Sequence, residues 1–156
     1  MLRKLIEGPE AAIRVARLPR PLVFTNGVFD VLHRGHVAFL AAARELGAAL
    51  LVALNSDRSV RLLAKGPDRP VNRQDDRAFV LEALQCVSAV VLFDEATPVA
   101  LLRQRRPDIY VKGGDYAIEQ LEEAQVVRSW GGQAAALPFT AGYSTTALLQ
   151  RIRETA

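Results

Sequence analysis

The stretch LVFTNGVFDVLHRGH, residues Leu22 to His36, contains both histidines of this 156-residue chain. It opens with the apolar run Leu22–Thr25, continues through an Asn-Gly pair that permits a tight turn, and leads into the helical pattern VAFLAAARELG. A buried strand followed by a loop and a helix is the repeating unit of open parallel sheets. The stretch therefore predicts a strand that ends in a ligand-binding loop and a helix that begins around residues 33–35.

Further apolar runs repeat this pattern along the chain. They are continuous rather than alternating, as is typical of strands buried on both faces of a parallel sheet. Helical patterns lie between them, with starts expected after Asn72 and at Thr97-Pro98, and a final helix that includes Leu148 and Ile152. We therefore predict an α/β fold, a Rossmann-like open parallel five-stranded sheet with helices on both faces. The other expected strands are Ala49–Leu54, Ala89–Phe93, Ile109–Val111 and Ala134–Phe139.

The length and composition favour one domain over residues 1–156, with residues 1–20 as a helical lead-in to the first strand. No apolar stretch approaches the ~20 residues that cross a membrane, and the N-terminus lacks the apolar core of a signal peptide. The single cysteine, Cys86, has no partner for an internal disulfide, which fits a reducing compartment. We therefore expect a cytoplasmic protein without membrane contact.

The positive charge of the chain is small and dispersed. The formal net charge is +3, and the densest basic cluster, Arg103 to Arg106, falls at the end of an expected helix, where cations complement the helix dipole. Nucleic-acid binding usually requires a concentrated basic stripe. We therefore expect no nucleic-acid partner, and a few cations that face a small anionic substrate account for the excess equally well.

His33 and His36 lie one turn apart at the expected helix start, where free N–H groups and the helix dipole favour anions. Three interpretations are open: capping or core histidines, a zinc site, and a phosphate site. Zinc needs about three protein ligands, and the chain offers no other histidine and only one distant cysteine. A phosphate site is favoured, because Gly35 between the histidines leaves room for a phosphate to approach the backbone.

The same stretch resembles the HxGH nucleotidyltransferases, whose first helix starts at His-x-Gly-His and binds a nucleoside triphosphate. The resemblance continues through VALNSDRSV, KGPDRPVN, RAFVLEAL, PDIYVKGGDY and GYSTTALL, so it covers roughly Leu22 to Arg153. It is strongest to the branch that adenylylates D-glycero-β-D-manno-heptose 1-phosphate, giving ADP-heptose for lipopolysaccharide core synthesis, in its stand-alone form. The resemblance implies a single nucleotidyltransferase domain that uses Mg²⁺ with ATP, takes heptose 1-phosphate as acceptor, and belongs to a family whose members often form homo-oligomers.

The resemblance also assigns residues to roles. It implies catalytic roles for His33, His36 and Lys65, with the histidines donating to the triphosphate and biased toward protonation by it, and the lysine closing as a lid contact. The acceptor substrate is expected at Asn55 and Asp57, which follow the second strand. The nucleotide is expected at Thr25, Asn26, Gly27, Val28, Phe29, Asp30, Gly35, Arg77, Lys112, Gly113, Gly114, Asp115, Gly142, Ser144, Thr145 and Thr146.

Some of these roles have alternatives. Asp30 is expected either to place Mg²⁺ or to orient a histidine, Lys65 and Arg77 are equally consistent with surface positions, and Ser144 is also a good cap for the last helix. The related glycerol-3-phosphate cytidylyltransferases carry an arginine where this chain has Phe139, which favours ATP over CTP. The alternatives for the whole chain are a cytidylyltransferase acting on glycerol 3-phosphate or another alcohol phosphate, and a non-catalytic nucleotide-binding regulatory module.

Overall fold

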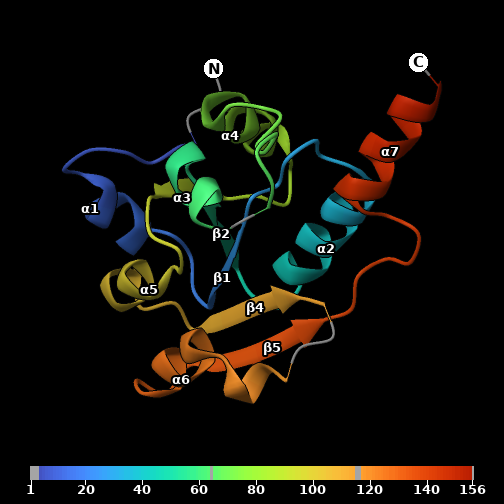
Figure 1. The fold of residues 1–156 in the computed structure, drawn as a ribbon. Coiled ribbons are helices and arrows are strands. Elements are labelled where there is room, and N and C mark those ends of the chain that lie inside the picture. Colours follow the sequence, from blue (N-terminus) through green and yellow to red (C-terminus); the bar gives the residue numbers. More distant parts are fainter. Residues whose placement is uncertain (1–3, 64, 115–116, 156) are drawn as a thin grey trace.

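A computed structural model describes residues 4–63, 65–114 and 117–155. Its five strands are parallel throughout and follow the order β3-β2-β1-β4-β5, so the predicted open parallel sheet is confirmed (Figure 1). The strand order reverses between β1 and β4, which is where ligands bind in such sheets. The elements are α1 (Ala11–Ala16), β1 (Leu22–Gly27), α2 (Arg34–Arg44), β2 (Ala49–Asn55), α3 (Asp57–Leu62), α4 (Gln74–Ala83), β3 (Ala89–Phe93), α5 (Val99–Arg105), β4 (Ile109–Gly113), the 3-10 helix η1 (Ile118–Gln120), α6 (Glu122–Arg128), β5 (Gln133–Leu137) and α7 (Thr145–Thr155).

Two apolar cores lie on opposite faces of the sheet. Successive residues of β1 alternate between them: Leu22 and Phe24 pack with α1, α5 and α6, whereas Val23 packs with α2 and α4. Strand β2 alternates in the same way and is buried along its whole length. Because both faces of each central strand are covered, the strand sequences are continuously apolar. Helices on both faces of the sheet are therefore confirmed.

Several element boundaries differ from the sequence prediction by one or two residues. Strand β5 ends at Leu137 rather than Phe139, because Pro138 has no N–H to continue the ladder. Helix α4 begins at Gln74 with Arg73 as its cap, and α5 begins at Val99 with Pro98 in the cap position. The shift at β5 matters for the site, since it releases Phe139 from the sheet.

The N-terminal segment and helix α7 lie at the periphery of the sheet. Before α1, residues 4–6 run beside β3, where Ile6 N–H donates to the Val90 carbonyl and Val90 N–H to that of Lys4. Helix α7 has no buried residue and stands next to the start of α2 (Figure 1). None of the helices in the described part of the chain is long and apolar enough to cross a membrane.

Candidate active site

A cavity of about 500 Å³ opens at the carboxyl ends of β1 and β4, between the starts of α2 and α7. Most of the predicted nucleotide-binding residues meet there, although they come from segments far apart in the sequence. Because every strand is parallel, the loops that follow β1 and β4 must emerge on this same edge. The predicted residues in its lining are Asn26, Gly27, Val28, Phe29, Asp30, His36, Lys65, Lys112, Gly113, Thr145 and Thr146.

The two histidines form a stacked pair at the start of α2. Their ring centroids are 3.8 Å apart, and His36 also meets the edge of Phe29 at 5.5 Å. The Gly35 N–H donates to Nδ1 of His33 at 3.1 Å, and the His33 N–H donates to Nδ1 of His36 at 3.4 Å. A ring nitrogen that accepts a hydrogen bond carries no proton, so each neutral ring keeps its proton on Nε2. The pair therefore presents Nε2–H donors, as an anion site requires.

Burial lowers the pKa of His36 to about 4, and the charges of His33, Lys65 and Arg69 act in the same direction against the opposing effect of Asp30. Burial also lowers the pKa of His33. Burial and the neighbouring cations therefore favour the neutral rings, and the bias toward protonation that we expected beside a bound anion stays a prediction. Both imidazoles can still bind a phosphate oxygen, since a neutral Nε2–H is a donor.

Three cationic side chains line the same cavity, namely Lys65, Arg69 and Lys112. Burial lowers the pKa of Lys65, with the Arg69 charge adding to the effect, and burial is also the largest cause of the lowered pKa of Lys112. Lowered lysine pKa values mean that burial makes the charged forms of these side chains costly. An anion bound among these groups would offset that cost, so the cluster favours phosphate groups.

Asp30 is bonded through its carboxylate to the cationic loop rather than to a histidine, and its expected role with Mg²⁺ stays a prediction. Its carboxylate is buried and accepts hydrogen bonds from Arg69 Nε at 2.8 Å, the Val71 N–H at 2.7 Å and the Asn72 N–H at 3.0 Å. Its backbone carbonyl accepts from Thr145 Oγ1 at 2.9 Å. Asp30 therefore joins three segments: the loop before α2, the loop that carries Lys65, and the start of α7. It is a positioning residue for the cationic loop.

The backbone on both sides of Asp30 is strained. Phe29 and Val31 have φ values of 47° and 48°, a region that residues with a Cβ rarely adopt and that is least favourable for a β-branched side chain such as Val31. Such strain persists only where surrounding contacts over-determine the conformation. Here the bonds of the Asp30 carboxylate and carbonyl supply those contacts, and Val28 and Phe29 at this turn line the cavity.

The second phosphate-binding turn predicted from sequence lies at the start of α7. The Ser144 hydroxyl caps this helix by accepting from the Ala147 N–H at 3.0 Å, and Gly142 supplies the positive φ of 83° that the preceding turn needs. Thr145 and Thr146 reach the main cavity, whereas Gly142 and Ser144 line a smaller neighbouring cavity with His33. The positive ends of α2 and α7 thus meet beside the histidine pair, which suits a chain of phosphates.

An aromatic wall closes the end of the cavity at β4. The Phe139 ring, 61% exposed, meets Phe39 edge-on at a centroid distance of 6.4 Å. A Cβ added to Gly113 would lie 2.6 Å from Cε1 of Phe139, so only glycine lets the ring lie against the β4 backbone. An exposed ring above a bare backbone is a suitable surface for a flat nucleobase.

Six predicted site residues among those described line neither of these two cavities, namely Thr25, Gly35, Asn55, Asp57, Arg77 and Gly114. Arg77 is 2% exposed, so its interpretation as a surface residue is wrong; its guanidinium donates to Asp57 Oδ1 and to the carbonyls of Val28, Asn55 and Asn72. Asn55 is buried and donates from Nδ2 to Ser59 Oγ, which removes it from the substrate position that we expected.

Asp57 is likewise taken by its ion pair with Arg77, at 2.7 Å, and so serves the fold around α3 and α4 rather than the expected acceptor site. Thr25 is fully buried, with its hydroxyl donating to the Val111 carbonyl across β1 and β4. Gly114 lies beyond the cavity lining, where its N–H donates to the Leu137 carbonyl. Asp115 lies outside the described residues.

The cavity also contains residues that the sequence reasoning missed, namely Arg69, Phe39 and Phe139 in the lining roles described above. Phe139 had been singled out only as a replacement for an arginine, and Phe39 was part of an ordinary helical pattern. Arg69 shares the Gly-Pro loop with Lys65, and a cation so close to a predicted phosphate contact was the signal that could have identified it.

Residues 24–151 match the family described as cytidylyltransferase-like. The chain belongs to this family. It is 59% identical over 144 residues to the D-beta-D-heptose 1-phosphate adenylyltransferase of Bordetella bronchiseptica, covering 92% of this chain and 89% of that protein. It is also 53% identical to the bifunctional protein HldE of Streptomyces coelicolor, covering 92% of this chain but only 31% of that longer relative.

Two solved structures agree with the fold. The lipopolysaccharide core biosynthesis protein from Thermoplasma volcanium superposes with a TM-score of 0.63 at 25% identity, covering 76% of this chain and 95% of that one. Pantothenate synthetase from Thermus thermophilus superposes with the same TM-score, 0.63, at 16% identity, covering 99% of this chain and 71% of the other, and supports the fold alone. The family match and the 59% identical adenylyltransferase relative confirm the nucleotidyltransferase assignment made from the histidine stretch.

Proposed function

We propose that this chain transfers the adenylyl group of ATP to D-glycero-β-D-manno-heptose 1-phosphate, releasing pyrophosphate and forming ADP-heptose for lipopolysaccharide core synthesis. The observation that carries the proposal is the composition of the main cavity and its smaller neighbour, where two imidazole Nε2–H donors, three cations and two helix starts converge. The substrate and the pathway are those in the names of the 59% identical relative and of the Thermoplasma structure.

The reaction needs charge stabilisation rather than a base. An oxygen of the sugar phosphate, already an anion, attacks the α-phosphorus of ATP; the bond from that phosphorus to the bridging oxygen breaks, and pyrophosphate leaves with the electron pair. No proton has to be removed from the nucleophile, and the carboxylate in the cavity lining, Asp30, is already bonded to three donors. The protein's contribution is to align two anions and to stabilise the charge that moves between them.

Different lining residues are assigned to the two tasks of aligning the substrates and stabilising charge. We assign the triphosphate to the Nε2–H groups of His33 and His36 and to the start of α7, where Thr145 and Thr146 add hydroxyl and backbone donors. Lys65 approaches from the loop anchored by Asp30, which suits a contact that tightens when both substrates are bound. Lys112 adds a cation from the end of β4.

The adenine is assigned to the wall of Phe39, Phe139 and Gly113. A purine offers this wall a larger stacking surface than a pyrimidine, which supports ATP over CTP. Replacement of the arginine of the cytidylyltransferases by Phe139 supports the same choice, because an apolar ring removes a charged donor from this end of the cavity.

We further propose that Mg²⁺ enters as the complex with ATP. The described residues contain no group of three or more His, Cys, Asp or Glu side chains arranged to hold a metal ion. Mg²⁺ is commonly held by substrate phosphates with one or two carboxylates and water, so a cavity that binds the triphosphate fits a metal carried by the substrate. When bound, the ion would neutralise charge on the phosphates.

The test is pyrophosphate release by the purified chain with Mg²⁺ and D-glycero-β-D-manno-heptose 1-phosphate, in parallel arms with ATP and with CTP. We expect release with ATP only, and ADP-heptose identified by mass spectrometry. Release with CTP only would contradict the adenine assignment. A chain that binds ATP but releases no pyrophosphate in either arm would contradict the proposed reaction, as the regulatory-module alternative requires. His36→Ala should abolish release while leaving the melting temperature nearly unchanged.

A further inference from the structure

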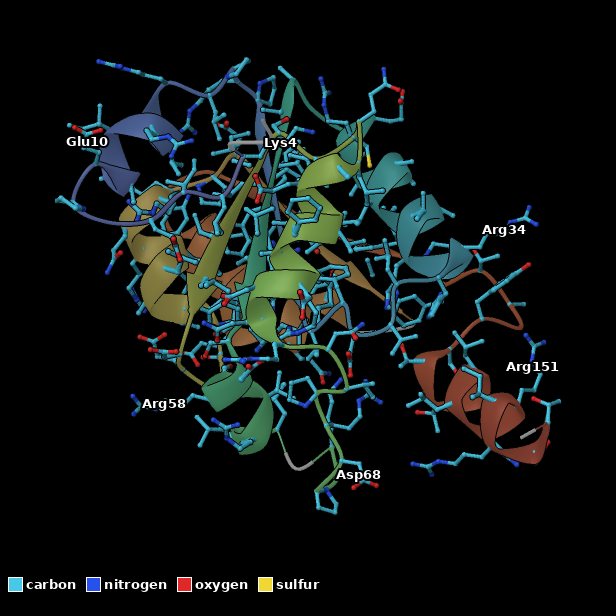
Figure 2. All side chains as sticks on the ribbon, turned by 90° about the horizontal axis from the view of Figure 1, so that it is seen from above. Lys4, Glu10, Arg34, Arg58, Asp68 and Arg151 are labelled. Atoms are coloured by element: carbon cyan, nitrogen blue, oxygen red, sulfur yellow. The ribbon has the colours of Figure 1, made fainter. Side chains whose placement is uncertain are left out.

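A second cavity, of about 760 Å³, adjoins the nucleotide cavity on the side of the Lys65 loop. One wall is the loop from Lys65 to Val71, and the other is a single face of α7. The two cavities share Lys65, Arg69 and Thr146, so cations and a hydroxyl stand at the boundary between them. We call the second cavity the loop–α7 groove. Figure 2 shows Asp68 at the tip of this loop, on the side of the molecule where α7 lies.

We propose that the loop–α7 groove binds the sugar of the acceptor, with the acceptor's phosphate at the shared cations Lys65 and Arg69. This inference rests on the proposed function and deepens it, since it replaces Asn55 and Asp57 as the expected acceptor site. In a displacement at phosphorus, the attacking oxygen and the leaving pyrophosphate lie roughly in line on opposite sides. The acceptor therefore needs an entrance that the nucleotide does not fill, and the groove provides one that leads directly to cations.

The walls of the groove match the chemistry of a sugar. Thr146, Leu149, Gln150 and Arg153 are spaced at three, four and seven residues, so they lie on one face of α7. Gln150 and Arg153, with Asp68 opposite, offer donors and acceptors for hydroxyl groups. Leu149 and the prolines of the loop offer apolar surface for the C–H face of a sugar ring. An acceptor with many hydroxyls would use both kinds of surface.

The polar groups of the groove are exchangeable rather than committed to the fold. Arg153 Nη2 and Asp68 Oδ2 form an ion pair of 3.6 Å across the groove, with side chains 72% and 78% exposed. Exposed pairs of this kind contribute little to stability, because water competes for both partners. Sugar hydroxyls can therefore replace the pair, with Asp68 accepting and Arg153 donating, without a large loss of protein stability.

Asp30 holds both walls of the groove. Its carboxylate bonds to Arg69 and to the Val71 N–H of the loop, and its carbonyl bonds to Thr145 at the start of α7. The spacing of the walls near the cations is thus set by one buried residue. Farther out, where α7 has no buried residue, the walls meet only through exposed groups, so the outer groove can adjust to its occupant.

The experiment compares steady-state kinetics of Arg153→Ala and Asp68→Asn with those of the native chain. We expect the KM for heptose 1-phosphate to rise about tenfold or more in each variant, since each loses a charge-assisted bond to a hydroxyl. The KM for ATP and the melting temperature should remain within about twofold and a few degrees of native values. Arg58→Ala, which removes an exposed arginine on α3 outside both cavities, is the matched control and should change neither constant.

Two results would overturn the groove assignment: an unchanged KM for heptose 1-phosphate in both variants, or an equal rise in the KM for ATP. A native chain that releases no pyrophosphate with heptose 1-phosphate would instead refute the proposed function. In that case calorimetry with the ATP-bound protein and heptose 1-phosphate, glucose 1-phosphate or mannose 1-phosphate decides about the groove. Binding that Arg153→Ala weakens about tenfold would support the groove, and absence of binding of all three would refute it.

Discussion

Asp30→Asn is the most informative single substitution, because it changes the charge of one buried group and almost nothing of its size. The native carboxylate side chain is fully buried and bonds to Arg69 Nε, the Val71 N–H and the Asn72 N–H. An asparagine has one acceptor oxygen, so at least one of the two carboxylate positions becomes an NH₂ group facing N–H donors. The bonds at that position are lost and are replaced by a repulsive contact.

The magnitude follows from the bonds that are lost. If the amide nitrogen takes the position of Oδ2, the bonds to Arg69 at 2.8 Å and to Val71 at 2.7 Å disappear. Hydrogen bonds to charged groups contribute about 1.5–3 kcal/mol each, so docking of the loop weakens by about 3–5 kcal/mol. The protein can avoid the full loss by releasing the loop locally. We therefore expect a fall in melting temperature of less than about 5 °C, with the main damage confined to the loop.

The activity should fall much more than the stability. If the native loop is docked with little free energy to spare, a loss of about 3 kcal/mol leaves it docked in roughly one molecule in a hundred. Only those molecules then hold Lys65 and Arg69 in place. We expect kcat/KM for pyrophosphate release to drop by up to about a hundredfold. Limited trypsin digestion followed by mass spectrometry should show faster cleavage after Lys65 in the variant. Asp76→Asn, on the exposed side of α4, is the matched control.

The reasoning would be refuted by an Asp30→Asn protein whose kcat/KM and cleavage rate after Lys65 both match those of the control. A fall in activity fully explained by global unfolding, with no faster cleavage under native conditions, would also refute it. Either result would mean that the loop is held by contacts other than the Asp30 carboxylate.

Four further predictions concern other residues. Arg77→Met should lower the free energy of unfolding by about 3–5 kcal/mol in urea titrations, because it leaves Asp57 and three carbonyls without their donor. Activity per folded molecule should persist, whereas lost activity with unchanged stability would support a phosphate role. His36 should titrate near pH 4 by NMR, and a midpoint near 6.5 would contradict the burial argument. Because burial lowers this pKa from its ordinary value of 6.5, the contribution of the neutral ring to stability should be lost as the pH falls from about 6.5 toward 4. Gly113→Ala should raise the KM for ATP about tenfold with little change in melting temperature, because the added Cβ displaces the exposed Phe139 ring; an unchanged KM would remove that ring from the adenine site. Lys65→Ala should lower kcat more than it weakens ATP binding measured by calorimetry, and equal losses would argue against a contact that forms late.

The fold could be predicted from the sequence because its evidence is local and repeated. Each buried strand corresponds to a short continuous apolar run in the sequence, and each helix to an apolar stripe between turn residues. Because these two patterns alternate along the chain, they predict a parallel sheet. The parallel sheet in turn requires the loops after β1, β4 and β5 to share one edge. That is why the histidine stretch, KGG and the Ser-Thr-Thr turn could be expected together before any contact was known.

The roles of single polar residues could not be predicted in the same way. Four polar residues stand at or near the ligand edge in sequence, yet in the structure they bond to neighbouring groups of the fold, namely Thr25, Asn55, Asp57 and Arg77. A carboxylate or guanidinium near a site has the same sequence signature whether it faces a ligand or a buried carbonyl. Which of the two applies depends on burial, which is a property of the packed chain.

By itself, then, the sequence determined the layering of this protein, the edge on which its site lies and the histidine pair at its centre, because these follow from periodicity and chain order. Only the tertiary structure decided that Asp30 anchors the Lys65 loop, that Arg69 and Phe139 face the cavity, and that Arg77 does not. The physical reason is that hydrogen-bond partners such as Asp30 and Val71 are 41 residues apart. Their pairing is settled by folding, when each buried polar group must find a partner in whatever segment packs against it.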